Sequence, residues 1–178
     1  VPTTWQEFLD VCRKLKDEGI TPLSVCYKDA WIQSLIPYAL SATTIYRENP
    51  DFDREMADGT RHFDGAEWKK TFEMLKTLID SGYVTENFLQ TTYDQQLRAF
   101  ADGRAAMMVM GSWGGSMIRS MNAGCNFGLF ILPASSDGVN WIPSSVGGML
   151  AVSEQSAHKE TAIDFLNFFL TNDDVYRQ

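Results

Sequence analysis

A tryptophan in a glycine-rich turn is the side chain of this sequence best suited to contacting a small molecule. Trp113 lies in the segment Gly-Ser-Trp-Gly-Gly at residues 111–115, which directly follows the continuous apolar run at residues 105–110. Such a run predicts a strand buried on both faces, so the turn stands where that strand ends. An indole can stack on the C–H face of a sugar ring, while nearby polar groups bond the sugar hydroxyls. The same indole could instead pack over the glycines as part of a core, and the sequence leaves both interpretations open.

Side chains that could catalyse a reaction do not form a familiar catalytic motif. The histidines His62 and His158 lie far apart, without the HExxH of a zinc hydrolase. The stretch that begins at Gly114 reads G-x-S-x-I and lacks the closing glycine of a nucleophile elbow, and no P-loop or dinucleotide-binding motif occurs. A pair of carboxylates acting as in glycosidases stays open, because such pairs are defined in space.

Metal and redox chemistry also find little support in the sequence. Asp51-x-Asp53-x-Glu55 imitates the start of a calcium-binding loop, but Met56 replaces the required glycine and no glutamate closes the loop. Three cysteines occur without the spacing of metal ligands or of a C-x-x-C motif: Cys12, Cys26 and Cys125. We therefore expect no metal, no cofactor and buried structural cysteines.

The composition is that of a folded domain and disfavours the binding of nucleic acid. The 178 residues are 44% hydrophobic and 21% charged, which is typical of a globular protein with one well-buried core. Fifteen Lys and Arg against 23 Asp and Glu give a net charge of −8, which repels phosphate backbones. The apolar runs fall short of the ~20 residues that cross a bilayer, so we expect no transmembrane helix.

Helices alternating with short strands predict an α/β layered fold. A capping box of Thr4 and Glu7 opens a helix over residues 5–17, and a strand at 20–25 follows. Further helices are expected over these stretches: 31–44, 64–82, 93–101, the residues from the glycine-rich turn up to 121, and the segment after 156 that is buried through Ala162, Phe165, Leu166 and Phe169. Further strands are expected at 105–110, 127–132 and 146–152, and residues 47–63 form a hairpin or surface excursion.

Several short segments, each unspecific alone, carry a resemblance when they are taken in series. They are PTTWQEF at 2–8, GITP at 19–22, AFADGRAAM at 99–107, GSW at 111–113 and GLFILP at 128–133. In order and spacing they resemble the carbohydrate-type solute-binding proteins of ABC importers, the family of maltose-binding protein. The resemblance implies a periplasmic-binding-protein-like lobe, with helices packed around a small mixed sheet and a strand-helix return segment.

The resemblance also implies how the chain divides into domains. In this family two α/β lobes joined by crossover segments close on a sugar. Residues 1–132 correspond to the second lobe, 133–145 to a crossover connector, and 146–178 to a strand and helix of an otherwise missing first lobe. We therefore expect an excised fragment of a larger binding protein.

Five residues of this sequence match positions that contact ligand in the family. The resemblance implies that Trp113, preceded by Ser112, stacks on the sugar, and that Asp29 and Trp31 contact ligand from the loop after the first strand. Gly148, of the glycine pair at the crossover, lets the backbone approach the ligand. Local alternatives remain: Asp29 as a helix N-cap, Trp31 as a packing residue and Gly148 in a bulge.

The function implied by the resemblance is non-catalytic capture of a mono- or oligosaccharide in an interlobe cleft and delivery to the membrane permease of an ABC importer. The protein is then extracellular, as a cell-surface lipoprotein or in the periplasm. A carbohydrate-processing enzyme similar to the glycoside hydrolases, or a plain interaction module, are the alternatives. The sequence does not name the sugar.

Overall fold

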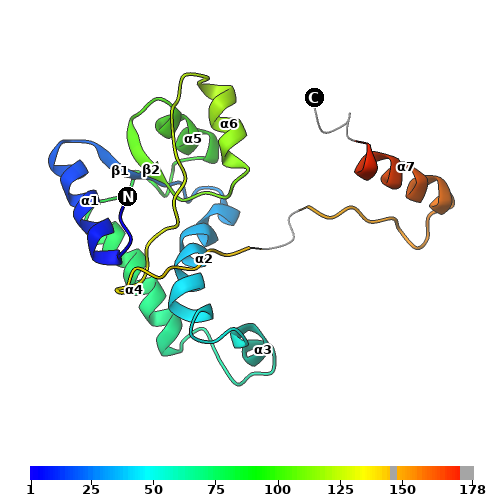
Figure 1. Cartoon of the computed structure of the whole chain (residues 1–178), viewed down its shortest axis with the longest axis horizontal. Coiled ribbons are helices and arrows are strands. Elements are labelled where there is room, and N and C mark those ends of the chain that lie inside the picture. The colour runs from blue at the N-terminus through cyan, green and yellow to red at the C-terminus, as the bar shows by residue number, and fades with distance from the viewer. Residues whose placement is uncertain (145–147, 173–178) are drawn as a thin grey trace. The chain divides into compact units, whose positions relative to one another are not determined.

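The computed structural model describes residues 1–144 and 148–172, and the chain divides into two compact units. The first unit is Val1–Pro143 and the second is Ser144–Gln178. In chain order the first unit contains α1 (Trp5–Asp17), β1 (Thr21–Ser24), the 3-10 helix η1 (Ala30–Ser34), α2 (Leu35–Ser41), the π-helix η2 (Ala42–Tyr46), α3 (Phe52–Ala57), α4 (Ala66–Asp80), α5 (Tyr93–Ala101), β2 (Ala105–Met108) and α6 (Gly114–Met121). The second unit contains α7 (Lys159–Thr171) (Figure 1). Each unit is described here by itself.

Helix α1 begins at the predicted capping box. The N–H of Glu7 donates to the Thr4 hydroxyl (3.3 Å), and the Glu7 carboxylate accepts from the N–H of Thr4 (3.2 Å). These bonds satisfy N–H groups that the first turn would otherwise leave unpaired. Gly19 follows the helix with φ +74°, a conformation that glycine adopts without a steric penalty. The prediction of this helix is confirmed at both ends.

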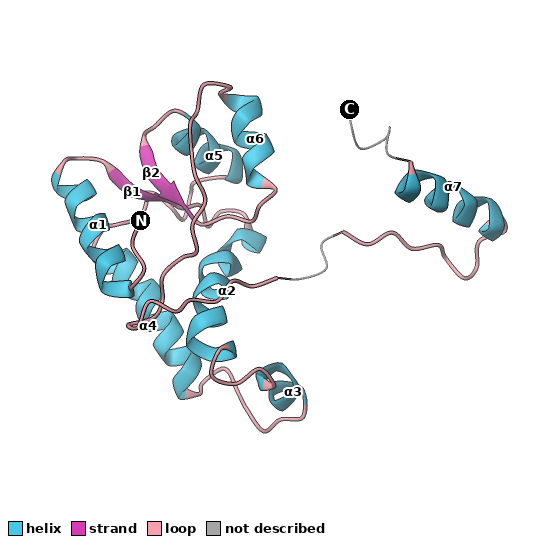
Figure 2. Ribbon diagram, in the orientation of Figure 1, coloured by secondary structure: helices cyan, strands magenta, loops and turns pink. Residues whose placement is uncertain are grey.

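The sheet consists of two parallel strands. Strands β1 and β2 lie side by side (Figure 2). Thr21 lies opposite Ala105 and Leu23 lies opposite Met107, and Leu23 also forms a parallel bridge to Val84. The expected α/β lobe is confirmed, but the expected mixed sheet is not, since every pairing among the described residues is parallel. Parallel strands end at the same edge of a sheet, so the loops that follow β1 and β2 leave the sheet at one edge.

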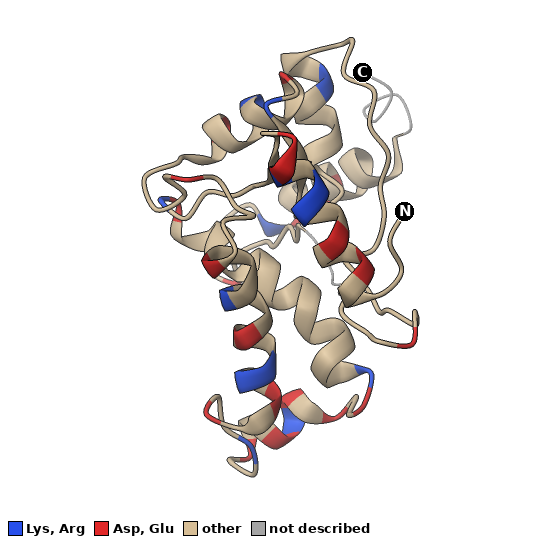
Figure 3. Ribbon diagram, turned by 90° about the vertical axis from the view of Figure 1, so that its left-hand side faces the viewer, with Lys and Arg blue, Asp and Glu red and all other residues tan. Residues whose placement is uncertain are grey.

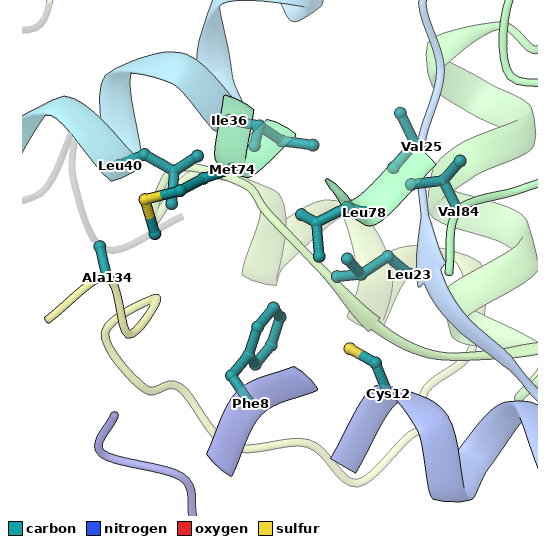
Figure 4. Packing of buried hydrophobic residues seen from close by; sticks show 10 residues of the cluster. All are labelled: Phe8, Cys12, Leu23, Val25, Ile36, Leu40, Met74, Leu78, Val84 and Ala134. Atoms are coloured by element: carbon teal, nitrogen blue, oxygen red, sulfur yellow. The ribbon is translucent and has the colours of Figure 1, made fainter. Parts of the chain in front are cut away.

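The main core fills the space between the sheet and the helices around it. Its buried members are Phe8, Cys12, Leu23, Val25, Ile36, Leu40, Met74, Leu78, Val84 and Ala134. Figure 4 shows Phe8 and Cys12 of α1 directed towards Leu23 of β1 and Leu78 of α4. Burial of a large apolar side chain contributes about 1.5–3 kcal/mol, so this layer supplies much of the stability of the first unit.

The predicted single helix at residues 31–44 is divided into three elements. A 3-10 turn (η1), α2 and a π-helical turn (η2) follow one another. Pro37 lies in the first turn of α2, where the missing N–H does no harm, and it could not continue an α-helix from the residues before it. The surface excursion at 47–63 contains one short helix, α3, whose Phe52 is buried against Ile45 and Trp68.

Two predicted strands are not observed. Residues 127–132 are irregular, and Leu129 is 82% exposed. Of the strand expected at 146–152, residues 145–147 lie outside the described residues, and 148–152 do not form a strand. An apolar run becomes a strand only where a neighbour pairs with its backbone groups, and in the described part of the chain neither segment pairs with a strand.

The stretch expected to be a connector packs on the first unit as far as Pro143. Hydrogen bonds attach it, among them Trp5 N–H to the Ser135 carbonyl (2.9 Å), Asn140 Nδ2 to the Thr3 carbonyl (2.7 Å), Trp141 N–H to Thr43 Oγ1 (2.9 Å) and Arg47 Nη1 to the Val139 carbonyl (2.6 Å). The start of α1 and the π-turn η2 therefore hold residues 133–141 in place. Its role as a crossover stays a prediction.

Helix α7 differs from its prediction in burial. The helix forms, but none of its residues is buried, and Phe165 and Phe168 are 61% and 59% exposed. Within the second unit, the described residues before the helix are irregular and offer no element on which its apolar side chains could pack.

Charged residues of both signs are interspersed along the described helices instead of gathering by sign (Figure 3). Among the described residues, no helix combines the length and apolar character that spanning a bilayer requires.

Candidate ligand-binding site

Two loops leave the sheet at the same edge. Strand β1 ends at Ser24 and leads to η1, while β2 ends at Met108 and leads to α6. Ser24 and Met108 are paired in the parallel register, so the following residues start side by side. In open parallel sheets ligands bind at this carboxyl edge, which makes the two loops the candidate site.

A buried amide fixes helix α5 to the end of β1. Gln96 is 2% exposed, its Nε2 donates to the Ser24 carbonyl (2.8 Å), and the Ser24 hydroxyl donates to the Gln96 carbonyl (3.0 Å). The Cys26 thiol donates to Gln96 Oε1 (2.8 Å). Buried polar groups that are fully bonded favour one arrangement over others, so the loop after β1 has a defined position relative to α5.

The Cys26 thiol is a structural group in this arrangement. Burial, with a smaller contribution from the nearby Asp29, raises the pKa of Cys26 to about 12. Burial likewise raises the pKa of the Tyr27 hydroxyl to about 12. Both groups are therefore protonated at neutral pH, and Cys26 does not provide a thiolate nucleophile.

Asp29 bonds the start of a different helix from the one expected. Its Oδ2 accepts from the Tyr93 N–H (2.7 Å) in the first turn of α5, and it makes no side-chain capping bond to η1. A carboxylate is favourable there because the unpaired N–H groups of a helix start carry partial positive charge. Asp29 thus joins the loop after β1 to α5.

Tyr93 contacts both helical elements that follow the two loops, η1 and α6, and it was not among the predicted site residues. The Trp31 and Tyr93 rings meet edge to face, with centroids 5.1 Å apart, and the Tyr93 hydroxyl donates to the Met117 sulfur of α6 (3.1 Å). Its only local signal is its position after Thr92, which forms a capping box with Gln95. That signal predicts a helix start but no contact with either loop.

Trp113 stands at the start of α6, with half of its side chain exposed. Its backbone is helical (φ −61°, ψ −25°), so Met117, four residues later, lies on the same face of α6. Trp113 is 53% exposed and Trp31 is 50% exposed. The core interpretation of Trp113 holds only in part, since its ring lies against Gly111 while much of it faces solvent.

The other two predicted site residues differ in their placement. Ser112 is exposed directly before Trp113, whereas Gly148 is exposed in the second unit. A β-carbon added at Gly148 would meet no atom within 4 Å, and Gly147 lies outside the described residues. The first unit therefore brings together Asp29, Trp31 and Tyr93 and connects them to the turn of Ser112 and Trp113, while the role of Gly148 stays a prediction.

Metal ligands do not gather in the part of the chain that the structure describes. No group of three or more His, Cys, Asp and Glu side chains there could hold an ion. The calcium-like segment lies in and beside helix α3, where Asp53 accepts from the Tyr46 hydroxyl (2.6 Å) and Glu55 accepts from Asn49 (2.8 Å). These carboxylates already serve as partners for protein groups.

Known proteins resemble both the sequence and the fold. The "Multiple sugar-binding protein" of Streptococcus mutans is 26% identical over 178 residues, a match that covers 96% of this chain and 41% of that protein. A chitin oligosaccharide binding protein of known structure is 31% identical over 76% of this chain and 34% of its own, with a TM-score of 0.66. A sugar transporter from Bacillus licheniformis, solved in complex with stachyose, shares the fold over 99% of this chain and 47% of its own, with a TM-score of 0.75 at 20% identity.

This chain thus spans less than half the length of each of these relatives. The model of one protein family matches residues 1–178, and its description is of solute binding, not of catalysis. The α/β lobe and the loops at its carboxyl edge agree with that match. The chain belongs to the bacterial extracellular solute-binding proteins.

Proposed function

We propose that this chain is the second lobe, with a return segment of the first, of an exported protein that captures a mono- or oligosaccharide and delivers it to the permease of an ABC importer. The observation that carries the proposal is the set of aromatic side chains at the carboxyl edge of the sheet. Trp31 and Trp113 are half exposed there, and Tyr93 lies between their loops.

Exposed indoles at a sheet edge suit a sugar better than most other ligands. A sugar ring has C–H faces that stack on an aromatic ring and hydroxyls that require donors and acceptors. The exposed Ser112 directly precedes Trp113 in the sequence. Asp29 lies two residues before Trp31, and its carboxylate accepts a hydrogen bond from the start of the helix that carries Tyr93. Asp29 acts in this proposal first by positioning that helix.

The relatives support a saccharide as the ligand class. Two of them are named for binding multiple sugars and chitin oligosaccharides, and the third was solved with stachyose. None of these names decides which sugar this protein takes. The capture we propose involves no chemical change of the sugar and no cofactor.

A complete site requires a second surface. We propose that residues 133–145 are the crossover to the other lobe and that residues from 146 onward, Gly148 among them, belong to it. Closure of the two lobes would then bury the sugar and exclude water, and the closed form would dock on the permease outside the cytoplasmic membrane. A lipid anchor and a periplasmic location are the two ways to keep the protein there.

The test uses the complete parent protein, screened by thermal shift against a carbohydrate library and then by calorimetry. Trp113→Ala should weaken the best ligand by about 2 kcal/mol, roughly 30-fold, because a stacked indole loses its buried surface. Phe63→Ala removes another exposed aromatic side chain, 66% exposed in the loop before α4, and should leave the affinity unchanged. Unchanged affinity of the folded Trp113→Ala protein would contradict the site.

Two further outcomes separate the alternatives. Release of smaller saccharides from an oligosaccharide panel would show a glycoside hydrolase, and the absence of any thermal shift would favour an interaction module. The present chain alone should bind far more weakly than its parent, beyond about the millimolar range, because the hydrogen-bond partners of the other lobe are absent. Equal micromolar binding by chain and parent would place the whole site in this lobe.

A further inference from the structure

Gly111 lies under the ring of Trp113. A β-carbon built at Gly111 would overlap three atoms of the six-membered ring of that indole, namely Cε3, Cζ3 and Cη2. Any other residue at position 111 would therefore displace the ring. The Gly114 N–H donates to the Gly111 carbonyl (3.0 Å), so a closed turn holds Gly111 and the start of α6 in a constant relation.

The backbone does not explain why this position is glycine. The glycines with positive φ in the described chain are Gly19, Gly59, Gly82, Gly103 and Gly138. Gly111 is not among them, so its conformation is open to residues with a side chain. The requirement at position 111 comes from the indole and not from the backbone.

We propose that Gly111 is a positioning residue for the ligand contact of Trp113, an inference that rests on the proposed function. The bare α-carbon provides the surface on which one part of the indole lies, and Trp113 is 53% exposed at the carboxyl edge. A β-carbon at 111 would force the ring into another rotamer, away from the position in which it can stack on a sugar. The stability of the fold should change little, because the half-exposed ring can move into solvent.

The same turn offers a matched control. A β-carbon at Gly115 would lie 3.6 Å from Cζ of Phe127, which is ordinary van der Waals contact, and alanine is favoured over glycine within a helix. Gly114 is unsuitable as a control, because its β-carbon would lie 2.6 Å from Cγ of Met110. Gly111→Ala and Gly115→Ala therefore make the same chemical change four residues apart, and only the first meets the indole.

The binding experiment uses the complete parent and the best ligand of its carbohydrate screen. Gly111→Ala should weaken binding by about tenfold or more with little change in Tm, and Gly115→Ala should not weaken it. In a Trp113→Ala background, Gly111→Ala should cause no additional loss, because the two changes remove the same contact. An equal loss in both backgrounds would overturn the inference, since Gly111 would then act through the fold.

A second measurement follows the ring without any sugar. With 5-fluorotryptophan in the parent, Trp113→Phe identifies the fluorine resonance of Trp113, which should shift in Gly111→Ala and stay in place in Gly115→Ala. An unshifted resonance with unchanged affinity would overturn the inference. A shifted resonance with unchanged affinity would support the positioning of the ring but contradict Trp113 as a sugar contact. If the parent binds no carbohydrate, the proposed function fails, and the resonance alone decides the role of Gly111.

Discussion

Helices α1 and α7 have the same length but differ in burial. Each has 13 residues, and each carries large apolar side chains at helical spacing. Helix α1 buries Phe8 and Cys12 against the sheet and α4, whereas α7 buries none of its residues and leaves Phe165 61% exposed. The comparison teaches that an apolar stripe predicts a helix, while burial depends on whether another element lies against that stripe.

The N-terminal ends of the two helices also differ in their capping bonds. Helix α1 starts at a capping box and receives a further bond from the Trp5 N–H to the Ser135 carbonyl. Helix α7 begins after His158, which makes no side-chain capping bond. The stability of α1 therefore depends on the unit that surrounds it.

The largest expected effect is the difference between two phenylalanine truncations. Phe8→Ala should lower the free energy of unfolding by about 3–5 kcal/mol, because it leaves a cavity in the main core. Phe165→Ala should change it by less than about 0.5 kcal/mol, since the side chain is exposed. Urea unfolding followed by circular dichroism measures both, and equal losses would show that α7 is buried in solution.

The next largest effect should be a loss of stability at alkaline pH that depends on the buried thiol of Cys12. Burial raises the pKa of Cys12 from 9.0 to about 12, so above pH 9 the unfolded chain loses this proton while the folded protein keeps it. Stability from this group is present below pH 9 and declines as the pH rises towards 12. Unfolding free energies between pH 8 and 11 should fall less steeply for Cys12→Ala. Identical slopes for both proteins would contradict the raised pKa.

Self-association should be a smaller effect, confined to the second unit. Exposed apolar side chains lie along α7, namely Ile163, Phe165, Phe168 and Leu170, and such surfaces associate to exclude water. Phe165→Glu should therefore lower the mean mass of the chain in light scattering. Phe63→Glu, which changes an exposed phenylalanine of the first unit, is the control, and an equal response of both variants would remove α7 as the cause.

The smallest expected effect lies in the stretch 133–141. Arg47 Nη1 donates to Asp137 Oδ1 (3.0 Å), and Asp137 accepts the Val139 N–H (3.0 Å). The Val139 N–H and the Arg47 guanidinium hold the pKa of Asp137 below its ordinary value. Asp137→Asn should speed hydrogen exchange at the Trp141 amide, with almost no change in global stability. For the unmodified protein, the protection factor of the same amide, which corrects for the intrinsic pH dependence of exchange, should fall as acid protonates Asp137. An unchanged protection factor in both experiments would show that the Arg47–Asp137 pair does not hold this stretch.

Local sequence signals predicted many elements of the first unit. The capping box predicted at Thr4 marks the start of α1 in the structure, and the helix expected at 93–101 matches α5. The helix expected at 64–82 was placed less accurately, since its N-cap is Gly65 and α4 spans Ala66–Asp80. The strand predicted at 127–132, and the described part (148–152) of the strand predicted at 146–152, did not form, because a strand needs a neighbour and no local signal supplies one.

The sequence by itself determined the start of α1, the two loops that follow the paired strands, and the presence of Asp29, Trp31 and Trp113 in those loops or directly after them. Only the tertiary structure decided that Asp29 bonds Tyr93, 64 residues away, and that Tyr93 joins the loops through Trp31 and Met117. The physical reason is range: a helix cap or a turn depends on bonds within a few residues, whereas contacts between distant residues depend on how the helices pack on the sheet.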